Sequence, residues 1–211
     1  MNGPPPVGEL LRRVAGRTSG SELHRCDLCA LPLVQGHEHL VEPRSAKMLC
    51  ACQACSILFP SSASTRYKRV PRRLRRLDGF DGNGELWAAL SIPVSMAFLV
   101  PSSVSNGVVA VYPSPGGPTP EPVDPDAWRR VVEAHPAVGE LEADVEALLV
   151  DRREQRREAY LAPIDRCYEL VGLVRIRWRG ITGGPDVRSA IDGFFERLRG
   201  DSTSDKEVRR V

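Results

Sequence analysis

Four of the six cysteines form two pairs whose spacing suits a metal ion. Two residues separate Cys26 from Cys29, twenty-two residues follow, and Cys52 and Cys55 repeat the spacing. Each CxxC turn can present two thiolates to one side, so two turns at the end of a hairpin can surround a tetrahedral ion. We therefore predict one bound metal ion, a structural zinc. Two metal-free thiol or disulfide pairs are the alternative.

The residues between the two pairs predict the hairpin that would bring them together. Residues 39–42 and 47–50 have the composition of short strands, and residues 43–46 link them. A module of roughly thirty residues cannot bury enough apolar surface to fold alone. A metal ion would substitute for the missing core, because its binding energy is also folding energy.

Iron in place of zinc is an open alternative, since rubredoxin-like centres also use two CxxC turns. Glycine commonly follows each of those turns and lets backbone N–H groups approach the sulfurs, which tunes the iron. Ala30 and Ser56 stand at these places here. This difference favours zinc.

Three further potential ligands lie close to the four cysteines in the sequence. Cys50 precedes Cys52 by two residues, so on a strand both would point to one face, and His37 and His39 show the same alternation. Any of the three could replace a named ligand or hold a labile metal. In the other interpretation Cys50 is a small buried hydrophobe and the histidines are exposed strand residues.

A basic segment, residues 66–77, follows the cysteines. It reads RYKRVPRRLRRL and carries seven positive charges and no negative one. Its cations are Arg66, Lys68, Arg69, Arg72, Arg73, Arg75 and Arg76. Next to a zinc ribbon they could contact a phosphate backbone. Val70, Leu74 and Leu77 recur at helical spacing after Pro71, however, which predicts an amphipathic turn docked on the body with its arginines solvated or facing a protein partner.

No catalytic motif is present. The chain has no GxSxG, Walker, GxGxxG or HExxH sequence, so we expect a non-enzymatic protein. A thiol-redox enzyme would need both CxxC pairs to cycle free of metal, which the ribbon spacing argues against. The acidic residues Glu140, Glu142, Asp144 and Glu146 are interpreted as a solvated face rather than a metal site.

Whole-chain properties narrow the class of protein further. The net charge of +2 over 211 residues gives no strong argument for a nucleic-acid or membrane partner. The first twenty residues lack the apolar core of a secretory signal, and the longest apolar stretch, residues 94–100, is too short to span a bilayer. We expect a cytoplasmic protein, where crowded cysteines indicate metal or redox chemistry.

The remaining pattern predicts an α+β fold, in which the N-terminal zinc-ribbon or rubredoxin-like hairpin precedes an antiparallel sheet with packed helices. Asn106-Gly107 predicts a hairpin turn. Residues 145–161 are interpreted as a second hairpin, with a continuous helix as the alternative because the segment has few turn residues. Asp124 and Asp165 are expected to cap helices. Residues 113–125 hold six prolines and are expected to be a loop.

These expectations divide the chain into five parts. Residues 1–22 form a flexible arm, 23–60 the metal-binding ribbon and 61–79 a basic linker segment. Residues 80–200 form the α+β body, and 201–211 a flexible tail.

Several of these stretches also carry a family resemblance. CDLCALPL, LCACQACSILF, YKRVPRRLRRLDGF and WRGITGG resemble an uncharacterised family of small actinobacterial and related bacterial proteins, over residues 24 to about 199. Genes of that family lie among those of nickel–iron uptake hydrogenases. The resemblance implies Cys26, Cys29, Cys52 and Cys55 as the family's CxxC pairs, with Cys50 in its LCACxxC stretch. It implies no catalytic residue.

Three functional hypotheses follow from the residues and the resemblance together. The leading one is a non-enzymatic, zinc-binding accessory protein for assembly, maturation or partner docking of a nickel–iron hydrogenase. Its partner would be a hydrogenase subunit or a maturation factor. The second is a rubredoxin-like iron electron carrier for the hydrogenase, and the third a zinc-ribbon nucleic-acid-binding protein.

Overall fold

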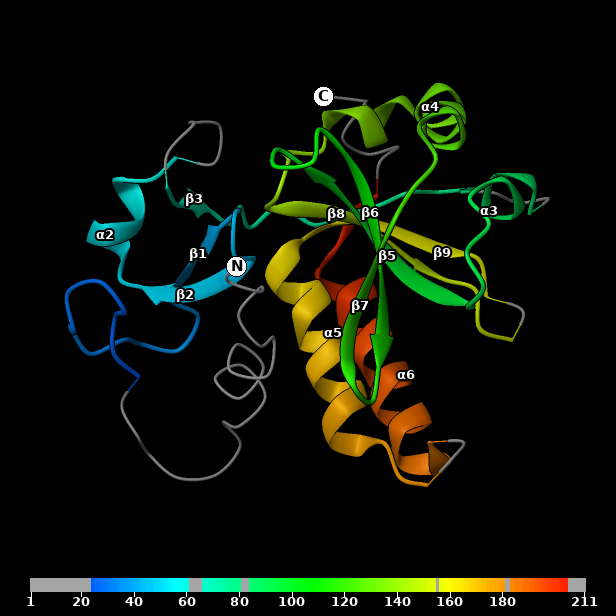
Figure 1. Cartoon of the computed structure of the whole chain (residues 1–211). Coiled ribbons are helices and arrows are strands. Elements are labelled where there is room, and N and C mark those ends of the chain that lie inside the picture. Colours follow the sequence, from blue (N-terminus) through cyan, green and yellow to red (C-terminus); the bar gives the residue numbers. More distant parts are fainter. Residues whose placement is uncertain (1–23, 61–65, 81–83, 155, 181–182, 205–211) are drawn as a thin grey trace, which may run out of the picture.

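The protein is built around two β-sheets of unequal size (Figure 1). The computed structural model describes residues 24–60, 66–80, 84–154, 156–180 and 183–204. The predicted arm, residues 1–22, lies outside the described residues. An α+β fold was expected, and the structure confirms that class.

The small sheet holds the strands predicted between the two cysteine pairs. Strand β1 (Glu38–Glu42) pairs antiparallel with β2 (Lys47–Ala51), and helix α2 (Gln53–Ile57) follows β2 directly. Strand β3 (Lys68–Arg69) joins the free edge of β1. We call residues 24–60 together with β3 the N-terminal lobe.

The β1–β2 hairpin buries both of its faces. Leu40 and Leu49, directly opposite each other, pack in a small core with Cys26 and Cys52. Val41 and Met48, one residue along, belong to the large core of the body. Because successive side chains of a strand point to opposite faces, one face of the hairpin supports the cysteines and the other holds the lobe against the body.

The large sheet has seven strands in the order β10-β4-β9-β8-β5-β6-β7. They are β4 (Arg75–Arg76), β5 (Met96–Ser102), β6 (Gly107–Ser114), β7 (Gly117–Pro122), β8 (Glu146–Asp151), β9 (Glu158–Pro163) and β10 (Thr203–Ser204). All neighbours are antiparallel except β10 and β4, which run parallel. Both predicted hairpins, β5–β6 and β8–β9, are present.

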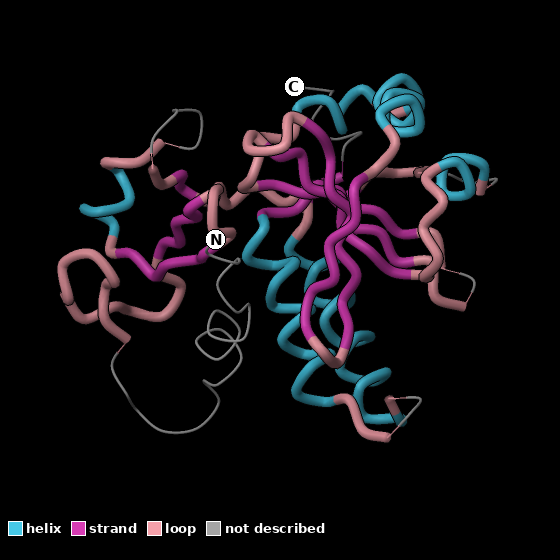
Figure 2. Tube along the Cα trace, viewed as in Figure 1, coloured by secondary structure: helices cyan, strands magenta, loops and turns pink. Residues whose placement is uncertain are grey.

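Helices cover both faces of the large sheet, as Figure 2 shows. Helices α5 (Ile164–Arg177) and α6 (Gly184–Asp201) lie on one face; α3 (Glu85–Ala89), α4 (Pro125–Ala134) and the 3-10 helix η1 (Pro136–Glu140) lie on the other. Phe98 on β5 points to the first layer and Leu99 to the second. Burial on both faces explains the uninterrupted apolar runs at residues 96–99 of β5 and 147–150 of β8. No helix in the described part of the chain is long and apolar enough to cross a bilayer.

The two predicted helix caps have different outcomes. Asp124 caps α4, since its carboxylate accepts from the N–H of Ala127 at 2.8 Å. Asp165 does not cap α5, because that helix already begins at Ile164, after Pro163. Asp165 lies in the first turn, and its carboxylate reaches a histidine of the N-terminal lobe.

The loop predicted for residues 113–125 is wrong. Strand β6 continues to Ser114, and β7 forms the edge of the large sheet. Pro118, Pro120 and Pro122 alternate along β7, while the N–H of Val123 bonds to β6 at 2.9 Å. Prolines at every second position of an edge strand fall where the N–H would point away from the sheet, so they cost no ladder bond.

The helical turn predicted within the basic segment is also wrong. The segment is extended: β3 completes the small sheet, and β4 pairs with β9 in the large one. The predicted linker therefore contributes a strand to each sheet. At the other end, the tail expected from residue 201 is structured to Ser204, because Thr203 and Ser204 pair with β4; residues 205–211 lie outside the described part.

Candidate metal centre

The first cysteine pair lies on a tight turn fastened to β2. The N–H of Ala30 bonds to the carbonyl of Cys26 and the N–H of Cys26 to that of Leu31, both at 2.8 Å. Asp27 holds the turn in place: its N–H donates to the carbonyl of Cys50, and its carboxylate accepts from the N–H of Cys50, both at 2.8 Å. Ala30 completes the turn with a φ of 62°, the left-handed conformation that glycine usually adopts.

The second pair lies at the start of α2. Cys52 is the N-cap, and its sulfur accepts from the N–H of Cys55 at 3.4 Å. The spacing of two residues therefore follows from helix geometry, because the residue at the third helical position supplies the capping N–H. That geometry turns both sulfurs to the same side.

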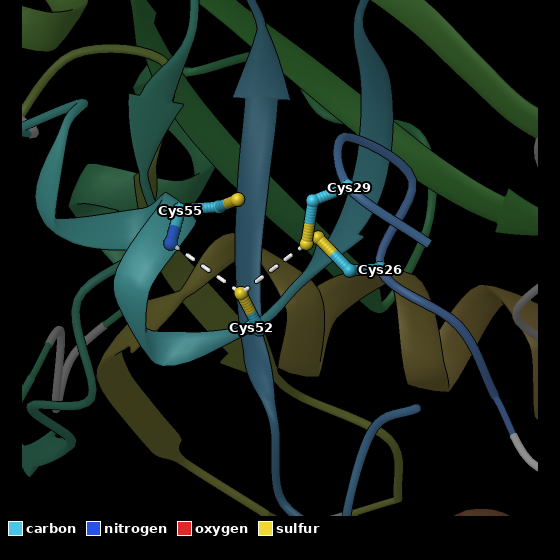
Figure 3. A group of neighbouring side chains, drawn as sticks. All are labelled: Cys26, Cys29, Cys52 and Cys55. Carbon is cyan, nitrogen blue, oxygen red and sulfur yellow. Dashed lines mark hydrogen bonds between the residues drawn. The ribbon is translucent and has the colours of Figure 1, made fainter. Parts of the chain in front are cut away.

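Figure 3 shows the four sulfurs directed toward a common space. One ligand atom from each of Cys26, Cys29, Cys52 and Cys55 lies within 4.8 Å of every other. The sulfurs of Cys29 and Cys52 are 3.7 Å apart. A tetrahedron with zinc–sulfur bonds of 2.3 Å has edges of about 3.8 Å, so the donor set and its spacing fit a single ion.

The thiols of this cluster differ in acidity. Burial opposes ionisation of Cys26, but backbone groups of Cys52, Cys29 and Leu28 outweigh it and lower its pKa to about 6. Hydrogen bonding to the sulfurs of Cys29 and Cys52 raises the pKa of Cys55 to about 12. One thiolate therefore forms readily, while a full set of four needs a cation to compensate its charge.

The three additional candidate ligands form a separate cluster. Donor atoms of His37, His39 and Cys50 lie within 4.8 Å of one another. The shared strand face predicted for Cys50 and Cys52 is absent, because the strand ends at Ala51 and Cys52 is the helix N-cap; of the two roles considered for Cys50, its position fits a separate metal rather than replacement of one of the four cysteines. The alternative that the histidines are merely exposed is also wrong, since all three residues are half-buried.

His39 is linked to the body. Its Nδ1 lies 2.8 Å from the Oδ2 of Asp165, across 126 residues of sequence. Burial lowers the pKa of His39, but the bonds and charges of Asp165 and Cys50 outweigh it and raise that pKa to about 9.

The basic segment meets the acidic residues in ion pairs. Lys68 contacts Asp144 at 2.7 Å, and Arg73 contacts Glu146. Arg73 also lies 3.8 Å from Glu142, and further pairs are Arg66–Glu42, Arg72–Glu38, Arg75–Glu140 and Arg76–Asp78. Asp144 and Glu146 are buried, so the expected solvated acidic face is wrong for these two residues, whereas Glu140 is exposed. Arg69 of β3 is exposed.

The comparison with known protein families decides the chain's membership. The family of unknown function DUF5947 matches residues 25–202. The chain belongs to the DUF5947 family. The match includes both cysteine pairs, the His37–His39–Cys50 cluster and the basic segment. No curated protein and no solved structure is detectably similar to the chain.

Two positioning residues were not found from the sequence. Asp27 binds the backbone of β2, and its place inside the first CxxC turn is the one local signal that could have indicated it. Asp165 lies so far along the chain from His39 that no local signal exists.

Proposed function

We propose that this protein is a non-enzymatic, metal-binding accessory protein whose four cysteines hold one structural zinc ion. The mutual approach of the four sulfurs carries the proposal, together with N–H groups directed at two of them. Zinc accepts tetrahedral thiolates without preference for another geometry. In a zinc-ribbon arrangement, the turn at Cys26 and the helix start at Cys52 would be the two CxxC turns that each supply two ligands to the ion.

The ion would supply the stability that the N-terminal lobe lacks. Its own core has six buried residues, of which Cys26 and Cys52 are two proposed ligands. So small a core cannot offset the entropy of ordering its chain. With zinc bound, the lobe becomes a rigid projection on the body.

The surface of that projection supports a docking role. Of the eight large exposed hydrophobic residues in the described part of the chain, five belong to the N-terminal lobe: Leu28, Leu31, Val34, Ile57 and Leu58. Leu28 lies between Cys26 and Cys29 and Leu31 follows that pair, while Ile57 and Leu58 follow the other pair. Clustered apolar surface is typical of protein–protein contacts. The family resemblance supports a cytoplasmic hydrogenase subunit or maturation factor as the partner.

Metal analysis tests the first part of the proposal. The full chain, purified anaerobically without a metal-binding tag, is expected to be colourless and to hold zinc, of which Cys26→Ser or Cys52→Ser removes one equivalent. Cys167→Ala, which deletes the buried thiol of α5, should retain the zinc. Metal-free wild-type protein from zinc-replete cells would refute the site.

Iron is a second candidate for the same site. The N–H groups directed at Cys52 and Cys26 and the left-handed Ala30 provide backbone geometry that iron–thiolate centres also use. A red protein with a reversible visible band would establish an electron carrier and exclude structural zinc.

Co-purification tests the docking role. A hydrogenase subunit or maturation factor should be captured by the wild-type chain and lost with Leu31→Glu plus Ile57→Glu. Val104→Glu is the matched control, because Val104 is an exposed hydrophobic residue of the body. Capture that survives the paired substitution would refute this surface.

Nucleic-acid binding has less support from the geometry. Six of the seven predicted cations contact carboxylates. Phosphate would have to displace these intramolecular partners, which reduces the gain from each contact.

A further inference from the structure

Three of the four histidines of the chain gather beside Cys50, outside the four-cysteine cluster. The rings of His37 and His39 meet edge-on with centroids 4.9 Å apart, and His24 lies 6.0 Å from His37. Donor atoms of His37, His39 and Cys50 all lie within 4.8 Å of one another. Two imidazoles and a thiol at this separation form a ligand set that zinc and other divalent transition ions favour.

Strand register brings two of these ligands together. His39 on β1 and Cys50 on β2 are directly opposite partners of the antiparallel ladder. The alternation of side chains puts them on the face of Val41 and Met48, which packs on the body, and not on the face of Leu40 and Leu49. The pair is therefore held by the most regular part of the N-terminal lobe.

Both histidines already use Nδ1 for a supporting contact. Nδ1 of His37 lies 3.1 Å from the carbonyl oxygen of Val34, and Nδ1 of His39 lies 2.8 Å from the carboxylate of Asp165. A carbonyl or carboxylate oxygen accepts, so each Nδ1 donates its hydrogen. Nε2 carries the ligand lone pair once each ring is neutral, and for His39 this requires loss of the second ring proton as the ion binds. A carboxylate or carbonyl behind each imidazole is the usual outer support of a metal-bound histidine.

We propose that His37, His39 and Cys50 form a second metal site, for a divalent transition ion of the zinc type. Three protein ligands leave the fourth tetrahedral position open to water or to an exogenous donor, the arrangement of reactive or exchangeable metal sites. Asp165 is a positioning residue that fixes the ring of His39 and ties the site to α5 of the body. The site goes beyond the structural zinc of the proposed function, because it uses none of the same ligands.

A second chemistry shares some of these residues. Cys50, His39 and Asp165 have the order of a thiol nucleophile, its base and an orienting carboxylate. The position of His37 favours a metal site over a nucleophilic thiol. A thiol nucleophile needs only one imidazole as its base, whereas a metal site uses the second imidazole, whose Nδ1 is already held by a hydrogen bond. His24 is a further nearby donor, and its Nδ1 is a buried nitrogen without a hydrogen-bond partner among the described residues.

Cobalt titration of the metal-free full chain tests the proposal. Co²⁺ bound to thiolate absorbs in the near ultraviolet, and the band grows with the number of coordinating sulfurs. We expect two equivalents to bind, one with a strong band and one with a weaker band. Cys50→Ser and His39→Gln should each remove the weaker equivalent alone, while His135→Gln, a histidine of the body, should leave both.

Separate variants distinguish this site from the four-cysteine site. Cys26→Ser should abolish the strong band and leave the weaker one, so either site can fail independently. Asp165→Asn should lower affinity at the second site about 10- to 100-fold and leave the first unchanged. The proposal would be overturned if the chain took up a single equivalent of Co²⁺ and the Cys50→Ser variant still bound it. It would also be overturned if iodoacetamide alkylated Cys50 rapidly and a second equivalent of Zn²⁺ did not slow that reaction.

Discussion

The Nζ of Lys68 on β3 lies 2.7 Å from Oδ2 of Asp144, just before β8, with side chains only 12% and 6% exposed. Asp144 also accepts from the N–H of Ser103 at 2.9 Å and from its hydroxyl at 2.5 Å. This nearly buried ion pair joins the small sheet to the large one. It lies beside the shared core of Val41 and Met48, so polar and apolar contacts hold the same interface.

Replacing only one residue of this ion pair should destabilise the protein far more than replacing both. Lys68→Met leaves the carboxylate of Asp144 buried without its cation, and we expect a loss of about 3–5 kcal/mol in the free energy of unfolding. Lys68→Met combined with Asp144→Asn should recover much of that loss. Urea denaturation of both variants measures the difference.

An exposed pair provides the matched control. Arg129 and Asp126 on α4 are 2.7 Å apart but 64% and 73% exposed, so Arg129→Met should change stability by less than about 1 kcal/mol. A Lys68→Met variant no less stable than Arg129→Met would show that the Lys68–Asp144 contact does not hold the lobe.

Local sequence signals predicted much of the fold and part of the candidate site. Asn106, with a φ of 51°, forms the expected hairpin turn, and Asp124 caps α4 as expected. The two CxxC pairs converge as predicted, because each follows from a turn or helix start only four residues long. All of these features depend on neighbours in the chain.

The errors arise where distant segments meet. Residues 66–77 and 140–146 could each be interpreted alone as a solvated charged surface, but each supplies the counterions of the other. The contact between His39 and Asp165 likewise had no local signal. Prolines at 118, 120 and 122 indicated a loop, because a strand accommodates them only where it has no partner strand on one side. The local sequence does not show that β7 lies at the edge of the sheet.

Replacing Ala30 with glycine should stabilise the protein. Ala30 has a φ of 62°, which costs a residue with a Cβ atom about 1–2 kcal/mol, whereas glycine adopts it freely. The greater freedom of glycine in the unfolded chain offsets part of this, so we expect a gain of about 0.5–1 kcal/mol. Thermal unfolding of the metal-loaded protein measures it. Ala54→Gly, on the exposed face of α2, should lower stability by about 1 kcal/mol, and equal effects would refute the turn geometry.

Alkaline pH should weaken the body through Tyr160. This side chain is fully buried, and burial, followed by its hydrogen bond to Glu158 at 2.8 Å, raises its pKa above the usual value. Above about pH 10 the unfolded chain releases the phenol proton while the folded protein keeps it, so stability falls as pH rises and is unaffected below. Urea denaturation at pH 8 and 11 should show a smaller decline for Tyr160→Phe than for wild type, and parallel declines would contradict this.

Removal of the metal should unfold the N-terminal lobe before the body. The lobe's own core consists of six buried residues including two proposed ligands, whereas the body keeps one large core entirely and most of a second, which it shares with Val41 and Met48 of the lobe. Hydrogen exchange of the chelated, reduced protein should therefore show fast exchange in β1 and β2 and retained protection in β8 and β9. Cys52→Ser with zinc present should reproduce the pattern, and Cys167→Ala should keep β1 and β2 protected. Equal loss of protection in both sheets would mean that the ion stabilises the whole fold, and slow exchange throughout would mean that the lobe folds without it.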